Sequence, residues 1–138
     1  MPAVSVPGNP KPRGLMVERR RLPNRREGDT VKVRLAGQSV YIRVAEFDDG
    51  SLGEIFVDVE KEGSFNRSLI NEWCIMFSYA LQIGGDLTYL VDKCLHSRFE
   101  PSGVVQEHPF IKSASSVLDL VARHLAIEYL DREDLKQA

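Results

Sequence analysis

The sequence predicts an α+β fold in which a three-stranded antiparallel β-meander is followed by three helices packed on one face of the sheet. Apolar residues alternate with polar ones over residues 30–60, and after residue 63 they recur every three or four residues. Strands that precede a run of helices are typical of an α+β domain. The chain has 138 residues, of which 43% are hydrophobic and 28% charged, which suits one domain with its own core.

The three expected strands each have one apolar and one polar side. The apolar sides are formed by Val31, Val33 and Leu35, by Val40, Ile42 and Val44, and by Ile55, Val57 and Val59. Turns are expected at residues 36–38, as a hairpin with a bulge, and at residues 48–51. The polar sides carry Lys32, Arg34 and Arg43 near Glu54, Asp58 and Glu60. We expect these charges to pair across the strands rather than to bind a metal ion.

The helical part begins with a long segment that Ser64 caps and that Gly84 and Gly85 end. Its wide apolar stripe predicts a central helix packed on the sheet. Asp86 is expected to cap a short second helix, and a third is expected from about Lys112 to Leu130.

The N-terminal part differs from the rest in composition and charge. Residues 1–17 are rich in proline and glycine and predict a disordered tail, residues 18–29 a basic arm, and residues 30–135 a single domain. Residues 1–28 hold seven Lys/Arg and two acidic residues, whereas the remainder holds 11 and 18. The arm contains Arg19, Arg20, Arg21, Arg25 and Arg26.

Features of membrane, secreted and metal-binding proteins are not found. There is no apolar run of about 20 residues, and residues 1–15 lack the apolar core of a signal peptide, so we expect a cytoplasmic protein without a membrane partner. Cys74 and Cys94 lie in apolar helical patterns, where cysteine is usually a small buried hydrophobe. His96, His108 and His124 have no partners at metal-ligand spacing, and no metal site is expected.

Catalytic motifs are also lacking. The sequence has no phosphate-binding P-loop, no dinucleotide-binding glycine motif and no Cys-x-x-Cys pair. Nothing combines a nucleophile, a base and an orienting group. The residues therefore predict a binding or scaffold domain rather than an enzyme.

Several separated segments carry a resemblance. They are LGEIFVD at residues 52–58, KEGS at 61–64, DK at 92–93, RFEPSG at 98–103, IKSA at 111–114 and SVLD at 116–119, with RRRLPNRR at 19–26 as a lead-in. In this order they resemble the TSCPD domain, the C-terminal module of adenosylcobalamin-dependent (class II) ribonucleotide reductases. The resemblance covers about residues 18–135.

The resemblance implies a role in deoxynucleotide supply without catalysis by this chain. In that family the reaction depends on a large barrel with a radical-forming cysteine, a redox cysteine pair and cobalamin. A chain of 138 residues is too short for this barrel, and the Cys-Pro-Asp motif of the module is missing. We therefore expect a non-catalytic accessory module that binds no cofactor itself and has a class II reductase as partner.

A ligand site is predicted from polar residues near the expected helix starts. Ser64 and Arg67 begin the first helix, Arg98, Glu100 and Ser102 lie in a bend, and Lys112 and Ser113 begin the last helix. Free N–H groups at helix starts favour anions, so these residues are candidates for binding a phosphate or nucleotide. The alternative function is a free-standing protein that sequesters a nucleotide, of the kind a phage could encode. If these residues have structural roles instead, the serines cap helices and Arg98 pairs with Glu100.

The basic arm allows a third function, nucleic-acid binding through its five arginines. However, no aromatic residue that could stack on bases lies between Gly14 and Val40. A solvated linker is one alternative, and an arm that pairs with Glu54, Asp58 or Glu60 of a neighbouring copy is another. Exposed sheet edges and apolar helices predict a homo-oligomer, with a dimer as the default.

Overall fold

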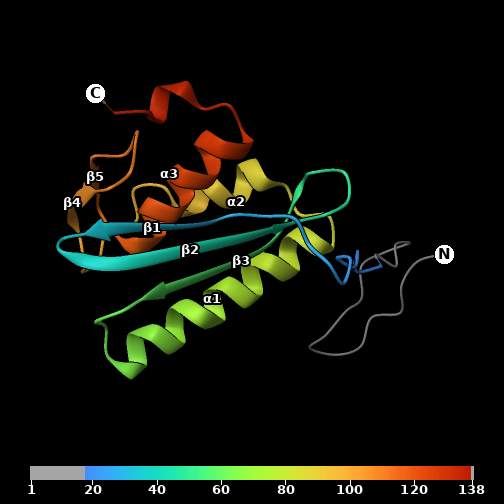
Figure 1. Cartoon of the computed structure of the whole chain (residues 1–138), viewed down its shortest axis with the longest axis horizontal. Helices are drawn as coiled ribbons and strands as arrows, with labels where there is room; N and C mark the ends of the chain where they lie inside the picture. The colour runs from blue at the N-terminus through green and yellow to red at the C-terminus, as the bar shows by residue number, and fades with distance from the viewer. Residues whose placement is uncertain (1–17, 138) are drawn as a thin grey trace, which may run out of the picture.

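A computed structural model describes residues 18–137 and confirms the α+β fold class. One antiparallel sheet has the strand order β3-β2-β1-β4-β5, and three helices contribute to a core on one side of it (Figure 1). The tail predicted for residues 1–17 lies outside the described residues.

The predicted meander forms the centre of the sheet. It consists of β1 (Thr30–Leu35), β2 (Gln38–Glu46) and β3 (Leu52–Val59). In the register, Val33 lies opposite Val40 and Ile42 opposite Val57, so the predicted apolar sides share one buried face. Ala36 and Gly37 both have positive φ, which gives a two-residue hairpin turn in place of the expected bulged one.

Two short strands extend the predicted meander to five strands. These are β4 (Gly103–Gln106) and β5 (Ser113–Ala114). Val105 of β4 lies opposite Leu35, which pairs β4 with the edge of β1 that β2 leaves free. Strands of four and two residues are too short to show an alternating pattern, and they depend on this distant pairing.

Two helix starts differ from the prediction. The helices are α1 (Ser64–Gln82), α2 (Leu87–Cys94) and α3 (Val117–Tyr129), and a 3-10 turn (Glu133–Leu135) follows them. Asp86 caps α2 as predicted, because its side chain accepts a hydrogen bond from the Thr88 N–H. In contrast, α1 is capped by Gly63 rather than by the predicted Ser64. The third helix begins after Ser116, which accepts from the Asp119 N–H, and not at Lys112.

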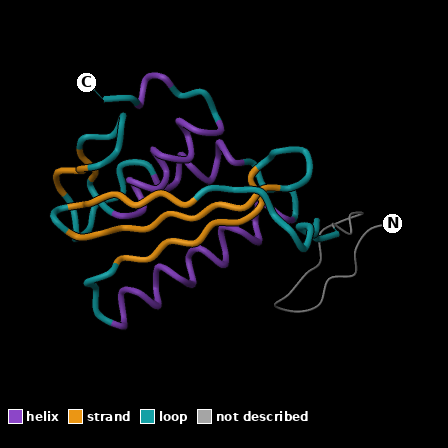
Figure 2. The backbone as a smooth tube through the Cα atoms, viewed as in Figure 1, coloured by secondary structure: helices purple, strands orange, loops and turns teal. Residues whose placement is uncertain are grey.

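Helix α1 contributes to the core and also lies along the free edge of β3 (Figure 2). The buried Ser78 hydroxyl accepts from the Ile55 N–H at 3.0 Å and donates to the Ile55 carbonyl at 3.3 Å. Gln82 donates to the Gly53 carbonyl at 2.9 Å. These side chains satisfy backbone groups that a further strand would otherwise bond, so α1 covers this edge.

The opposite edge is covered in a similar way. The Gln137 side-chain oxygen accepts from the N–H groups of Lys112 and Ser113, at the start of β5. Both edges of the sheet are therefore bonded to side chains of the same chain.

Residues 18–29, the predicted basic arm, lie against the domain. The Asp29 carbonyl accepts from the Val44 N–H at 2.9 Å, and the Arg20 N–H donates to the Gln82 carbonyl at 2.7 Å. A Cβ on Gly28 would lie 2.0 Å from the Val44 carbonyl oxygen, so only glycine fits at this approach.

Candidate functional site

The predicted site residues are divided among different parts of the surface. Arg98, Ser102 and Ser113 lie together in a polar pocket, and Arg67 lines a second pocket on the outer face of the sheet. Glu100 borders an apolar groove. Ser64 and Lys112 are exposed and line none of these three depressions.

The polar pocket lies beside the start of α3 and has a volume of about 360 Å³. Its walls are formed by three segments that are separated along the chain. They are lined by His96 and Arg98, by Ser102 and Gly103, and by Ser113, Ala114, Ser115, Asp119 and Arg123. The structure thus brings together residues of the predicted bend and of the segment before the last helix.

Asp119 is the fixed charge at the base of this pocket and is only 1% exposed. Its carboxylate accepts from the His96 N–H at 2.7 Å, from the Ser115 N–H at 3.0 Å and from the Arg123 guanidinium at 3.0 Å. Burial alone would raise the pKa of Asp119, but these hydrogen bonds outweigh it and lower the pKa. Asp119 is therefore an ionised group that organises the pocket.

In the polar pocket, Arg98 is the cationic side chain that remains available to bind a ligand. Among residues 18–137 its guanidinium makes no hydrogen bond or ion pair, and it does not pair with Glu100. Arg123, in contrast, is engaged by Asp119. An anion in this pocket could be bound by Arg98 with the hydroxyls of Ser102 and Ser113.

The predicted anion site at the start of the last helix is not formed by Lys112 and Ser113. The helix begins at Val117, and the N–H groups of Lys112 and Ser113 donate to Gln137. These two residues therefore offer no free helix-terminal N–H groups, although the Ser113 side chain lines the polar pocket.

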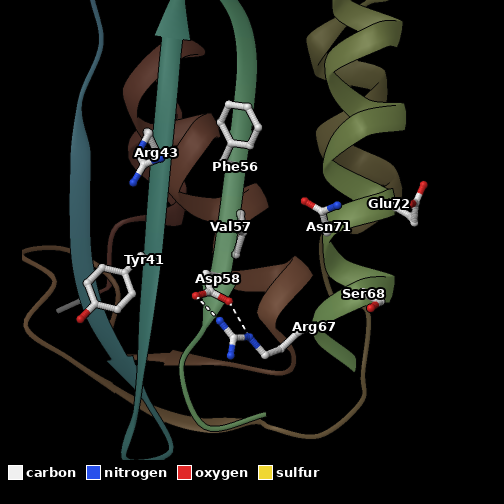
Figure 3. Close-up of a pocket in the computed structure, with 9 residues that line it drawn as sticks. All are labelled: Tyr41, Arg43, Phe56, Val57, Asp58, Arg67, Ser68, Asn71 and Glu72. Atoms are coloured by element: carbon white, nitrogen blue, oxygen red, sulfur yellow. Dashed lines mark hydrogen bonds and ion pairs between the residues drawn. The ribbon is translucent and has the colours of Figure 1, made fainter. Parts of the chain in front are cut away.

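The second depression, which we call the sheet-face pocket, lies between the outer face of β2 and β3 and the start of α1 (Figure 3). Its volume is about 460 Å³. The lining residues are Tyr41, Arg43, Phe56, Val57, Asp58, Arg67, Ser68, Asn71 and Glu72. Arg67, predicted as an anion ligand, makes a bidentate pair with Asp58 at 2.9 and 2.7 Å.

The third depression is an apolar groove of about 340 Å³ between α1 and residues 99–101. Trp73, Phe99, Pro101 and Leu118 line it, and so does Leu69 of α1. Leu69 also belongs to a set of exposed apolar side chains on α1, which we call the α1 stripe: Phe65, Leu69, Ile75, Met76 and Tyr79. Phe65 is 75% exposed and Met76 68% exposed, and only at Tyr79, within the described residues, does another side chain, that of Arg19, lie over a ring of the stripe.

Three arginines of the basic arm bond to the domain. Arg19 donates to the Gln82 side chain at 2.6 Å, Arg20 pairs with Asp49 at 2.9 Å and Arg26 pairs with Glu54 at 2.8 Å. Arg21 and Arg25 are exposed. Glu54 and Asp58, which were candidates for pairing with the arm of a neighbouring copy, thus have partners within the same chain.

A buried histidine pair was not predicted from the sequence. His108 Nε2 lies 3.1 Å from His124 Nδ1, and His108 Nδ1 accepts from the N–H groups of Phe110 and Ile111. The proton of a neutral His108 must therefore be on Nε2, and it is donated to His124. The two residues are 16 positions apart, in a loop and a helix, so their spacing carries no signal.

Neither histidine has the surroundings of a metal ligand. Within residues 18–137, no group of three or more His, Cys, Asp or Glu side chains could hold a metal ion.

Cys74 and Cys94 are buried free thiols, as predicted, and burial raises the pKa of Cys74 to about 11. No helix of the described residues has the length and apolarity needed to cross a membrane.

Comparisons with known proteins confirm the resemblance. Residues 10–129 match the TSCPD domain family. The vitamin B12-dependent ribonucleotide reductase of Agrobacterium fabrum is 48% identical over 118 residues, which are 86% of this chain and 9% of that protein. The enzyme of the same name from Bradyrhizobium diazoefficiens is 49% identical over 121 residues, or 88% of this chain and 10% of that protein.

A more distant relative is the vitamin B12-dependent ribonucleotide reductase of Rhodopirellula baltica, which is 37% identical over 84% of this chain and 11% of its own length. The chain therefore spans about a tenth of the length of these reductases. No solved structure matches it.

Proposed function

The chain belongs to the TSCPD domain family, and from this membership we propose that it is a cytoplasmic, non-catalytic accessory module of vitamin B12-dependent ribonucleotide reduction. The similarity to the reductases supports the link to deoxynucleotide supply, and it is confined to about a tenth of their length. The two buried thiols support a role without redox chemistry in this chain.

The α1 stripe is the observation that carries this proposal. A helix in a domain normally turns its polar side to water, but here Phe65, Leu69 and Met76 lie opposite the buried side of α1. Exposed apolar side chains that gather on one side of a helix often mark a contact with another protein. Since the relatives join this module to about nine times as much protein, we propose that the stripe docks onto the catalytic part of a reductase.

Co-purification with the vitamin B12-dependent reductase of the same source tests the proposal. We expect the full chain to bind the reductase and to change its turnover. Met76→Ser and Leu69→Ser should weaken binding about ten-fold or more, because central apolar contacts dominate interfaces. Tyr89→Ser is the matched control, since Tyr89 is also exposed but lies on α2. Failure to associate, together with unchanged turnover, would contradict the proposal.

Without a reductase, the same stripe is expected to join two copies of the chain. Apolar helix faces associate in water, and a two-fold pair buries the same patch on both copies. Light scattering should show a dimer at micromolar concentration that Met76→Ser converts to monomers. A 15.6 kDa species throughout this range would contradict the expected dimer.

Capture of a nucleotide or phosphate ligand is the second candidate function, because the polar pocket gathers three of the predicted residues, Arg98, Ser102 and Ser113. A nucleotide that binds the native state raises its melting temperature by mass action. We expect Arg98→Gln to reduce this shift and Arg21→Gln to preserve it, since Arg21 lies on the arm. A shift in Arg98→Gln as large as that of the unmodified chain would exclude the polar pocket.

A further inference from the structure

The outer face of the meander presents aromatic rings that no helix covers. In the register, Arg43 lies between Thr30 and Phe56, and Tyr41 lies between Lys32 and Asp58. Figure 3 shows Tyr41, Arg43 and Phe56 on the side of the strands that faces the viewer, with α3 behind the sheet. Phe56 is 42% exposed, although a strand position facing water is usually polar.

Arg43 is the available cation of this face. Within residues 18–137 it makes no side-chain hydrogen bond or ion pair, whereas Arg67 is bonded to Asp58 through both of its donors. Both carboxylates that lie diagonal to Arg43 on β3 have partners, because Asp58 pairs with Arg67 and Glu54 pairs with Arg26. A phosphate placed on Arg43 would therefore lie beside two neutralised carboxylates, while Glu72 lines the α1 wall of the same pocket.

Arg43 and Phe56 line two neighbouring depressions of the surface. The sheet-face pocket extends from them to Arg67 and Asn71 of α1. A neighbouring depression of about 310 Å³ also contains Arg43 and Phe56 and extends to Thr30 and Arg26. The two depressions thus share Arg43 and Phe56, and a pocket of about 460 Å³ is within the size range that small ligands occupy.

We propose that this outer face binds a nucleotide, with the base stacked on Phe56 and the phosphate held by Arg43. Bases stack on exposed aromatic rings regardless of their sequence, and arginine binds phosphate through two parallel donors. Ser68 and Asn71 on α1 provide hydroxyl and amide groups at the wall of the pocket, where the edge of a base could be hydrogen-bonded. The site shares no residue with the polar pocket and does not depend on the reductase proposal.

Calorimetric titration of the full chain with AMP, adenosine, ribose 5-phosphate and a ten-residue oligodeoxythymidylate tests this site. The variants are Phe56→Leu, which keeps an apolar side chain but removes the ring, and Arg43→Gln. Tyr89→Leu is the control for an exposed ring elsewhere, and Arg21→Gln is the control for an exposed arginine outside this face. Circular dichroism checks that each variant is folded.

We expect Phe56→Leu to weaken AMP binding roughly ten-fold, as stacking on an aromatic side chain predicts. Arg43→Gln should weaken AMP several-fold and leave adenosine unchanged, while both controls bind as the unmodified chain does. If the oligonucleotide binds more tightly than AMP does, and the same two variants weaken its binding, the nucleotide recognised by this face belongs to a single-stranded nucleic acid. No AMP binding at millimolar concentration, binding that survives both variants, or ribose 5-phosphate binding as tight as AMP would overturn the proposal.

Discussion

Helices α1 and α3 are both apolar around much of their circumference, but only α3 has its apolar residues covered. Leu120, Val121 and Leu125 of α3 are fully buried, whereas Phe65 and Met76 of α1 face water. On α1 the buried side includes Ser78 and Gln82, which bond the edge of β3. The difference teaches that α3 closes the core of this domain, while α1 joins the sheet on one side and exposes apolar side chains on the other.

The largest expected effect is in α3. Leu120→Ala should lower the free energy of unfolding by roughly 2–5 kcal/mol, because the removed methyl groups leave a cavity in a closed core. Urea denaturation followed by circular dichroism measures this loss. A loss below about 1 kcal/mol would show that α3 is not the packing centre.

A second effect on stability, which also comes from burial of a side chain, depends on pH. Burial, with a smaller contribution from His124, lowers the pKa of His108 from 6.5 to about 4. Above pH 6.5 both the native and the unfolded chain hold a neutral His108, so it adds no pH dependence there. Between pH 6.5 and about 4 only the unfolded chain takes up the proton, and the free energy of unfolding falls as the pH falls.

The loss due to His108 is at most about 1.4 kcal/mol per pH unit, and roughly 2–3 kcal/mol over this window, and His124, whose pKa burial also lowers, adds to the same trend. Urea denaturation at pH 7.5, 6 and 5 measures it, and His108→Gln should reduce the slope. Asp119 does not overlap this window, because its lowered pKa places its titration at lower pH. Equal slopes in both chains would contradict the role of His108.

The buried side of α1 should show a smaller effect. Ser78→Ala leaves the Ile55 N–H without its partner and should cost about 1–3 kcal/mol. Ser68→Ala is the matched control on the exposed side of the same helix and should cost less than about 0.5 kcal/mol. Similar losses for the two serines would show that α1 does not stabilise the edge of β3 through Ser78.

The smallest effect on stability is expected for the α1 stripe. Met76→Ser should change the free energy of unfolding of the monomer by less than about 0.5 kcal/mol, because Met76 is exposed in the isolated domain. The same substitution should reduce association strongly. Unfolding at low protein concentration measures the stability of the monomer, and light scattering at high concentration measures association. A large loss of monomer stability would contradict an interface role.

The elements that could be predicted are those whose apolar residues repeat regularly within one segment of the sequence. The alternation around Val33, Ile42 and Val57 predicted the meander, and the three-to-four residue repeat predicted α1 up to Gly84. β4 could not be predicted, because it exists through pairing with β1 about 70 residues earlier in the chain. The start of α3 was misplaced because Ala114 lies three residues before Val117 and so matches the apolar pattern of the helix, whereas the N–H groups of Lys112 and Ser113 donate to Gln137.

The candidate site shows the same division. Ser102 and Ser113 could be proposed from their positions beside a bend and a helix, and they do meet Arg98 in one pocket. The pairing of Arg67 with Asp58 could not be foreseen, because it depends on how α1 is placed against β3. No ligand role could be predicted for Phe56 and Tyr41, since in the sequence they occupy positions that alternate with the core and carry no motif.

The covered edges of the sheet limit how this domain can assemble. A sheet with unbonded edge strands is a template onto which further chains can add, and such addition leads to fibres. Here hydrogen bonds with Ser78, Gln82 and Gln137 occupy part of these positions, and the exposed apolar surface that we propose as an interface lies on a helix and not on a strand. Concentrated solutions of the protein should therefore form discrete helix-paired species of finite size, and fibrils should appear only in variants in which these side chains are removed.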